Sequence, residues 1–306
     1  MKINKSATFT DRNNCISCGG NQLLALSSGK FDEGSLKHFI EDDPWGEEHP
    51  LPFLVGKEWC FVSCKNCGMS FHRYILSPEW SERKFSKWMS QEAIDAFESS
   101  YKTPNTVFQK GRANAAHVLQ IERLTREIRD NVATRILDFG CGYGEFLSMC
   151  AAFGFEGYGV DRSTARHQGG CYENIFSEIE EVAHLAPFHA LTLFETVEHL
   201  DDPKNIMLQL RELLISGGIL VVEVPDCTGV TDIITQNDYY KIHPLEHLNG
   251  FTPETLRKFV IGLGFEPIDK QFASVTDDSK IIAKNIVKRL IKPFMKSTTQ
   301  MYFRKI

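Results

Sequence analysis

Residues 136–147 read ILDFGCGYGEFL, an apolar run that breaks into three glycines spaced two residues apart. A glycine-rich loop between a buried strand and a helix lets a nucleotide-like ligand approach the backbone. On both sides of this loop, apolar strand-like runs alternate with helical patterns. Strands are expected at 135–139, 157–160, 190–194 and 219–224, and helices at 144–153, 203–215 and 253–263. This alternation predicts an α/β fold built on a doubly wound parallel sheet.

The loop does not match the motifs that bind phosphate groups. The dinucleotide fingerprint G-x-G-x-x-G needs a third glycine where this chain has Glu145. An acidic side chain at the start of a helix would also repel a pyrophosphate. A Walker loop is excluded because no Gly-Lys-Ser/Thr follows. The sequence therefore indicates a nucleotide-like ligand without phosphate.

The spacing Gly140-x-Gly142-x-Gly144 resembles the first motif of class I S-adenosylmethionine-dependent methyltransferases, which have a Rossmann-like sheet. The resemblance implies that S-adenosylmethionine (SAM) binds at these glycines, with Asp138 near its polar end. Asp161 stands 17 residues beyond Gly144, at the end of the next expected strand. A carboxylate at that position can accept hydrogen bonds from both ribose hydroxyls.

Three further stretches follow in an order typical of one group of these enzymes. They are LTLFETVEHLDDP (191–203), ISGGILVVEVPD (215–226) and HPLEHLNGFTPETLRKFVIGLGFEP (243–267). Together with the loop they resemble methyltransferases related to the enzymes of ubiquinone and menaquinone biosynthesis, over about residues 110–270. His189 departs from the pattern, because such proteins usually carry Asp ahead of this strand, and we assign it no role.

Glu195, Glu198 and His199 form an E-x-x-E-H pattern. On a helical turn these three side chains share one face, where two carboxylates and an imidazole can hold a divalent ion such as Mg²⁺. Some relatives, among them quinone O-methyltransferases and small-RNA 2′-O-methyltransferases, use the pattern in this way. His243 or His247 is then the candidate fourth ligand. The alternative is that Glu195 and His199 only shape the SAM pocket.

Methyl transfer depends mainly on aligning the acceptor atom, the methyl group and the sulfur. A hydroxyl acceptor must also lose its proton near the transition state, and a histidine with a pKa near 6.5 suits that role. His199 and His247 are the candidate bases, although either could instead support the pocket without touching the acceptor. We expect the acceptor to be a small molecule or an intermediate of a glycan pathway.

Two CxxC pairs, Cys15 with Cys18 and Cys64 with Cys67, are separated by 45 residues. Each pair can supply two thiolates from a tight knuckle to one tetrahedral zinc ion, and a glycine follows each pair. Four thiolates leave no open position for water, so we predict a structural zinc. The remaining cysteines are expected to serve packing: Cys60, Cys141, Cys150, Cys171 and Cys227.

The stretch CKNCGMSFHRYILSPEW (64–80) resembles the amino-terminal zinc ribbon of bacterial methyltransferases associated with surface-glycan or nucleotide-sugar pathways. Sugar C-methyltransferases share this ribbon but carry a further carboxy-terminal domain, for which this chain ends too soon. O-methylation is therefore favoured, with C-methylation of a sugar as an alternative. We expect a zinc ribbon at 1–78, a helical connector at 79–132, a methyltransferase domain at 133–272 and a basic tail at 273–306. In the connector the expected buried positions are Trp80, Phe85, Trp88, Ala93, Phe97, Val118, Ile121, Leu124 and Ile128.

Composition places the chain among soluble globular proteins. Of its 306 residues, 42% are hydrophobic and 24% are charged. No apolar run is long enough to span a membrane, and the first ten residues lack the core of a signal peptide. Nine cysteines without an export signal indicate reduced thiols, so we expect a cytoplasmic protein.

Charge is distributed unevenly. Residues 279–306 hold eight basic and no acidic side chains, which leaves 26 basic against 40 acidic side chains in the rest, a balance of −14. The acidic body argues against nucleic acid as a partner, although an RNA-directed methyltransferase or an RNA-binding protein that uses the ribbon and the tail is an alternative. The tail can form a basic amphipathic helix that contacts the inner face of a membrane or packs on the acidic body. Its apolar positions are Ile281, Ile282, Ile286, Leu290 and Phe294, and its basic positions are Lys284, Lys288, Arg289 and Lys292.

Overall fold

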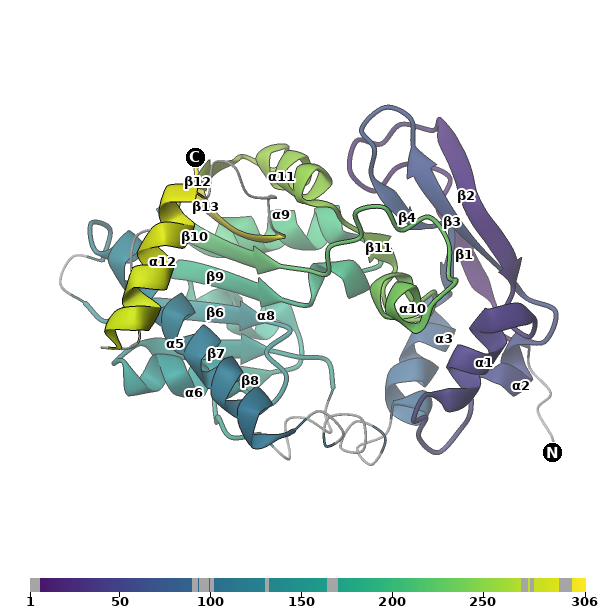
Figure 1. Cartoon of the computed structure of the whole chain (residues 1–306), viewed down its shortest axis with the longest axis horizontal. Coiled ribbons are helices and arrows are strands. Elements are labelled where there is room, and N and C mark those ends of the chain that lie inside the picture. The colour runs from purple at the N-terminus through teal and green to yellow at the C-terminus, as the bar shows by residue number, and fades with distance from the viewer. Residues whose placement is uncertain are drawn as a thin grey trace.

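The computed structural model describes residues 6–89, 93, 99, 102–129, 132–163, 170–270, 275, 278–291 and 299–306. Its largest element is a seven-stranded sheet with the strand order β12-β13-β10-β9-β6-β7-β8. The amino-terminal strands form smaller sheets at the other end of the molecule (Figure 1).

The central sheet is parallel apart from one strand. Its members are β6 (Arg135–Phe139), β7 (Glu156–Val160), β8 (Ile175–Phe176), β9 (Phe188–Phe194), β10 (Leu214–Glu223), β12 (Phe265–Ile268) and β13 (Gln300–Lys305). Strands β8, β7, β6, β9 and β10 pair in parallel, whereas β13 runs antiparallel to both of its neighbours. The predicted doubly wound sheet is confirmed.

Alternation along the strands divides the core into two layers, because successive side chains point to opposite faces. Ile136 and Ile219 pack against α5 (Pro104–Thr125) and α6 (Glu145–Ala152). Their neighbours Leu137 and Leu220 pack on the opposite face of the sheet. The helices of that second face are α8 (Ile179–Val182), α9 (Pro203–Leu213) and α11 (Pro253–Ile261).

Local sequence explains where these helices begin. Thr103 accepts a hydrogen bond from the backbone of Thr106 at the start of α5, and Thr252 does the same for Thr255 at α11. A proline follows each of these caps, and its missing N–H costs nothing at the first helical position. Of the expected buried positions in α5, Val118, Ile121 and Leu124 are buried. Ile128 lies beyond the helix and is half-buried.

The amino-terminal block, residues 6–89, combines short strands and helices. They are β1 (Phe9–Asp11), β2 (Leu23–Lys30), α1 (Gly34–Asp42), α2 (Leu51–Leu54), β3 (Glu58–Cys64), β4 (Ser70–His72), β5 (Tyr74–Leu76), α3 (Pro78–Arg83) and the π-helical turn η1 (Lys84–Trp88). Trp80, Trp88 and Ala93 are buried as expected. Phe85 is half-buried, and Phe97 lies outside the described residues.

The amino-terminal block and the central sheet share a hydrophobic core. Strand β11 (Asn249–Gly250), which follows α10 (Gln236–Ile242), pairs with β4 and so extends the amino-terminal sheet (Figure 1). One cluster of buried side chains includes Cys64 and Phe71 of the block together with Phe251 and Leu256. The boundary expected at residue 78 therefore does not separate two independent cores.

The carboxy-terminal segment is more than a tail. Strand β13 lies between β10 and β12, with Phe303 buried on one face of the sheet and Tyr302 on the other. This strand lies beyond the boundary expected at residue 272, and its alternating apolar side chains complete both layers of the core. The expected helix forms as α12 (Ser279–Ile291), where Lys284 and Ile286 are exposed. The description does not extend to residues 292 and 294 or to the side chains of Ile281, Lys288, Arg289 and Leu290.

No helix among the described residues is long and apolar enough to cross a membrane.

Candidate active site

The glycine loop joins β6 to α6 in a conformation that requires glycine. Gly140, Gly142 and Gly144 have φ angles of 81°, 55° and 78°, in the left-handed region that other residues rarely adopt. A Cβ on Gly144 would lie 2.6 Å from the Cβ of Tyr172, and one on Gly140 would collide with Thr196. The loop is therefore packed tightly against the segment that follows β9.

Asp161 directly follows β7 and faces this loop. Its two carboxylate oxygens accept hydrogen bonds from the backbone N–H groups of Gly142 and Ser163, each at 2.9 Å. The side chain lies at the carboxyl edge of the parallel sheet, where ligands of doubly wound folds bind. Its contact with ribose stays a prediction.

Asp138 lies inside β6 and is 3% exposed. Thr192 of β9 donates a hydrogen bond to its carboxylate at 2.6 Å. Burial raises the pKa of Asp138 to about 7. Asp138 stands two residues before the first glycine of the loop, and its contact with SAM stays a prediction.

Glu195 follows β9 with a left-handed backbone, at a φ of 48°. This conformation costs a residue with a Cβ about 1–2 kcal/mol, and such strain gathers at functional sites. The N–H of Glu195 donates to the carbonyl of Glu223, at the end of β10. Burial, and then the nearby carboxylate of Glu223, raise the pKa of Glu195 to about 7.

Glu198, His199 and His247 form one cluster at the turn that follows β9. Each offers a ligand atom, and these atoms all lie within 4.8 Å of one another. Glu198 is 1% exposed, and its Oε1 is 3.9 Å from Nε2 of His199. The rings of His199 and His247 meet edge to face, with centroids 4.7 Å apart. The turn η3 (Val197–His199) carries the first two of these side chains.

This arrangement differs from the ligand set expected from E-x-x-E-H. His247 joins Glu198 and His199 in the cluster, and the carboxylate of Glu195 lies beside that of Glu198. His243, the other candidate fourth ligand, is held elsewhere: its Nε2 lies 2.7 Å from the hydroxyl of Tyr239 and 3.4 Å from Asp43.

The cluster contains buried polar atoms without a hydrogen bond in the described part of the chain. They are both carboxylate oxygens of Glu198 and Nδ1 of His247. Burial and the neighbouring carboxylate of Glu195 raise the pKa of Glu198 well above its usual value. Burial lowers the pKa of His247 to about 4, so its ring is neutral at physiological pH. Buried unpaired polar atoms are costly unless a ligand satisfies them, so the donor set fits a divalent cation or a polar acceptor.

Sequence reasoning missed several residues around this cluster. Glu223 accepts a hydrogen bond from Gln300 of β13 at 2.6 Å and lies 3.6 Å from His117 of α5. Although burial opposes it, these two partners lower the pKa of Glu223. A carboxylate ending an apolar strand, VVEVP, was the only signal for Glu223.

The four cysteines of the two CxxC pairs lie together in the amino-terminal block. Sγ of Cys15 is 3.5 Å from Sγ of Cys67, and Sγ of Cys18 is 3.6 Å from Sγ of Cys64. A tetrahedral zinc with bonds of about 2.3 Å has its sulfurs about 3.8 Å apart, so the cluster fits zinc. Backbone N–H groups and nearby thiols outweigh burial and lower the pKa of Cys64 to about 7. Burial raises the pKa of Cys15 and of Cys67, so the thiolate form of these two cysteines depends on a bound cation.

The glycines after the two pairs support this interpretation. Gly19 and Gly68 have φ angles of 74° and 79°. Each donates a backbone hydrogen bond to the carbonyl of the first cysteine of its pair, Cys15 or Cys64. These are the tight turns that a zinc knuckle needs, and only glycine adopts them without strain.

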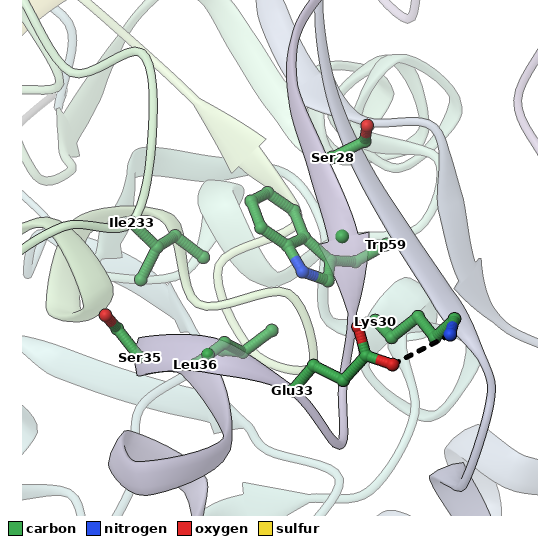
Figure 2. Close-up of a pocket in the computed structure, with 9 residues that line it drawn as sticks. Ser28, Lys30, Glu33, Ser35, Leu36, Trp59 and Ile233 are labelled. Carbon is green, nitrogen blue, oxygen red and sulfur yellow. Dashed lines mark hydrogen bonds and ion pairs between the residues drawn. The ribbon is translucent and has the colours of Figure 1, made fainter.

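A separate open pocket of about 290 Å³ lies on the amino-terminal block. Figure 2 shows Trp59 in its wall and the ion pair between Lys30 and Glu33 at its rim. Its lining residues are Ser28, Gly29, Lys30, Glu33, Gly34, Ser35, Leu36, Trp59 and Ile233. None of the predicted site residues is among them, so we do not assign the active site to this pocket.

Comparison with known proteins agrees with the site. A family model described as a methyltransferase domain matches residues 110–270, just over half of the chain. A ubiquinone biosynthesis O-methyltransferase of Glaesserella parasuis is 22% identical over 218 residues, which cover 60% of this chain and 92% of that protein. One from Psychrobacter cryohalolentis is 24% identical and covers 45% of this chain and 65% of that protein.

Solved methyltransferase structures align with this chain at low identity. A SAM-dependent methyltransferase from Archaeoglobus fulgidus is 23% identical, with a TM-score of 0.36, and covers 66% of this chain and 98% of that chain. The plantazolicin methyltransferase in complex with SAH is 12% identical, with a TM-score of 0.49, and covers 74% of this chain and 93% of that chain. The family match and the glycine loop at the carboxyl edge of the sheet give one conclusion. The chain belongs to the methyltransferase-domain family and is a SAM-dependent methyltransferase.

Proposed function

We propose that the protein transfers the methyl group of SAM to a hydroxyl oxygen of a small molecule or of a glycan-pathway intermediate. The observation that carries this proposal is the cluster of Glu198, His199 and His247 at the turn that follows β9. Thr196 connects the cluster to the glycine loop, because it precedes Glu198 by two residues and packs on Gly140. An acceptor bound at the cluster is therefore close to a ligand on the loop. The O-methyltransferase names of the curated relatives support the same acceptor atom.

The glycine loop and its surroundings are proposed to hold SAM. Gly140, Gly142 and Gly144 let the ligand approach the backbone, and Asp161 accepts hydrogen bonds from the ribose. Asp138 and Glu195 complete the pocket near the polar end of the ligand. A buried carboxyl beside a sulfonium gains favourable electrostatic energy when it is ionised, which suits the position of Glu195 at the loop.

The acceptor hydroxyl is proposed to lose its proton at His199 or His247. Both rings can accept a proton when neutral, and Glu198 lies within reach to stabilise a protonated His199. A divalent cation such as Mg²⁺ would also fit between Glu198, His199 and His247. A bound cation would lower the pKa of the acceptor hydroxyl. The two possibilities differ in their response to a chelator.

The test is transfer of labelled methyl from SAM to a panel of phenols, catechols and sugar derivatives with free hydroxyls. We expect label on oxygen. His199→Ala or His247→Ala, at saturating SAM, should lower kcat by about 100-fold or more if that ring is the base, with SAM affinity unchanged. Loss of activity with chelator and recovery with Mg²⁺ would assign the cluster to a cation. Label on a sugar carbon, or only on RNA, would contradict the proposal.

A further inference from the structure

Arg12 is a buried cation that connects the amino-terminal block to the active-site turn. It follows β1, lies three residues before Cys15 and is 9% exposed. Its Nε and Nη2 donate to the carbonyl of His72 at 2.9 and 2.6 Å, and Nη2 also donates to the carbonyl of Leu248 at 2.8 Å. Its Nη1 donates to Oδ1 of Asn249 at 2.8 Å and, more weakly, to the carbonyl of Asp201 at 3.4 Å.

Asn249 links Arg12 to the turn that carries Glu198 and His199. It is 1% exposed, and its Nδ2 donates to the carbonyl of Val197 at 3.0 Å and to that of Leu200 at 2.8 Å. These two carbonyls flank Glu198 and His199 along the chain. The amide oxygen and both N–H groups of Asn249 are therefore used, by Arg12 on one side and by the turn η3 on the other.

Lys84, the first residue of η1, makes a second connection from the same block. It is 4% exposed, and its Nζ donates to the carbonyl of Leu245 at 2.9 Å. The same Nζ is 3.7 Å from Oε1 of Glu246, whose other oxygen lies 3.9 Å from Nδ1 of His199. Glu246 therefore lies between a fixed cation and the candidate base.

We propose that Arg12 and Lys84 are positioning residues, through which the amino-terminal block sets the geometry of the Glu198, His199 and His247 cluster. The proposal rests on the proposed function in taking this cluster as the place where the acceptor is activated. Arg12 acts through Asn249 on the backbone of η3, and Lys84 acts through Glu246 on the ring of His199. Displacing a reacting group by about 1 Å can cost 100-fold in rate.

The variants Arg12→Lys and Asn249→Asp test this proposal in the full chain. A lysine keeps the charge but cannot reproduce the fork geometry with which the guanidinium of Arg12 reaches its four acceptors. An aspartate at 249 keeps the acceptor for Arg12, but it places a carboxylate oxygen where the amide donated to the carbonyls of Val197 and Leu200, so the link to the turn is replaced by repulsion. Arg73→Ala is the matched control, because Arg73 is half-exposed, joins the same strands and pairs with Asp11 and Asn13 within the block.

Two readouts separate this role from general support of the fold. With an acceptor found in the hydroxyl panel, kcat should fall about 10- to 100-fold in Arg12→Lys and Asn249→Asp, with the KM for SAM unchanged. Independently of any acceptor, ring NMR signals of His199 and His247 should shift in both variants, whereas those of the exposed His38 and His184 stay in place. Arg73→Ala should alter neither readout.

The outcomes are decisive in either direction. Unchanged His199 and His247 signals in folded Asn249→Asp protein would overturn the proposal, as would a kcat equal to that of Arg73→Ala. If the wild-type protein methylates no hydroxyl in the panel, the proposed function fails. The NMR comparison would then still decide whether Arg12 and Asn249 fix the turn.

Discussion

Two backbone hydrogen bonds fix the orientation in which the Asp161 carboxylate can bind a ligand. Gly142 and Ser163 each donate an N–H to its carboxylate, and this orients both oxygens before any ligand arrives. A carboxylate has about four acceptor positions, more than these two amides use. Because the side chain is already ordered, ligand binding costs less conformational entropy.

Replacement of Asp161 by alanine should weaken SAM binding. Two ribose hydroxyls would lose their acceptor, and the N–H groups of Gly142 and Ser163 would lose theirs, at a cost of about 1–3 kcal/mol. Calorimetric titration of SAM into the variant measures the loss. Glu254→Ala, on the exposed surface of α11, is the control with expected wild-type affinity. Equal affinities for the two variants, or binding of NADH in place of SAM, would contradict the assignment.

At the scale of elements, the sequence predicted what local patterns encode. Strand β6 begins and ends where the apolar run before the glycines predicted, because that run is bounded by charged and glycine residues. Strand β13 was missed, since the basic charge around it hides a short alternation of apolar side chains. Glu198 and His199 were found because their spacing is local. Arg12, Lys84 and Asn249 were not, because their roles depend on contacts between segments that are far apart in the chain, such as β4 with β11 and Lys84 with Glu246.

The hydrogen bond from His72 of β4 to α10 should make the free energy of unfolding depend on pH. His72, fully buried in β4, donates from Nε2 to the carbonyl of Ile242 at 2.8 Å. Burial lowers its pKa to about 3. Below pH 6.5, about the pKa of histidine in the unfolded chain, His72 becomes protonated in the unfolded chain but stays neutral in the folded chain. Stability is therefore lost as pH falls from about 6.5 toward 3, by about 2 kcal/mol at pH 5.

Urea unfolding near pH 7 and near pH 5 tests this dependence. His72→Gln keeps a donor toward Ile242 but has no proton to gain, so its loss of stability over this range should be about 2 kcal/mol smaller. His247, whose pKa is also lowered, is present in both proteins and cancels in the comparison. Identical losses in the two proteins would show that His72 does not carry the effect.

At the scale of the whole molecule, the cysteine cluster belongs to the core that also supports the central sheet. Cys15 and Cys64 are buried in the same hydrophobic cluster as Phe251 and Leu256. We therefore expect one zinc per chain, and Cys64→Ser should destabilise the block and the central sheet together. Structural zinc in small domains binds with about 10–16 kcal/mol, as much as the total stability of many domains.

Elemental analysis and calorimetric unfolding check this expectation. Cys60→Ser is the matched control, since Cys60 lies on the same strand, β3, outside the cluster. The control should keep its zinc and unfold in one transition near the wild-type temperature. Wild-type protein without zinc would contradict the metal site. A Cys64→Ser protein in which only the amino-terminal block melts early would contradict the shared core.

Helix α12 is the segment that we expect to contact an anionic membrane surface. Lys280, Lys284, Ile286 and Val287 are exposed on this helix, so basic and apolar side chains are both available to an anionic lipid surface. Each basic residue near such a surface contributes about 1 kcal/mol. Removing the segment would also remove β13 from the sheet, so charge reversal is the appropriate change. Lys280→Glu with Lys284→Glu should reduce co-sedimentation with anionic vesicles, whereas Lys258→Glu on α11 should not. Equal pelleting of both variants and the wild type would leave α12 without a role at the membrane.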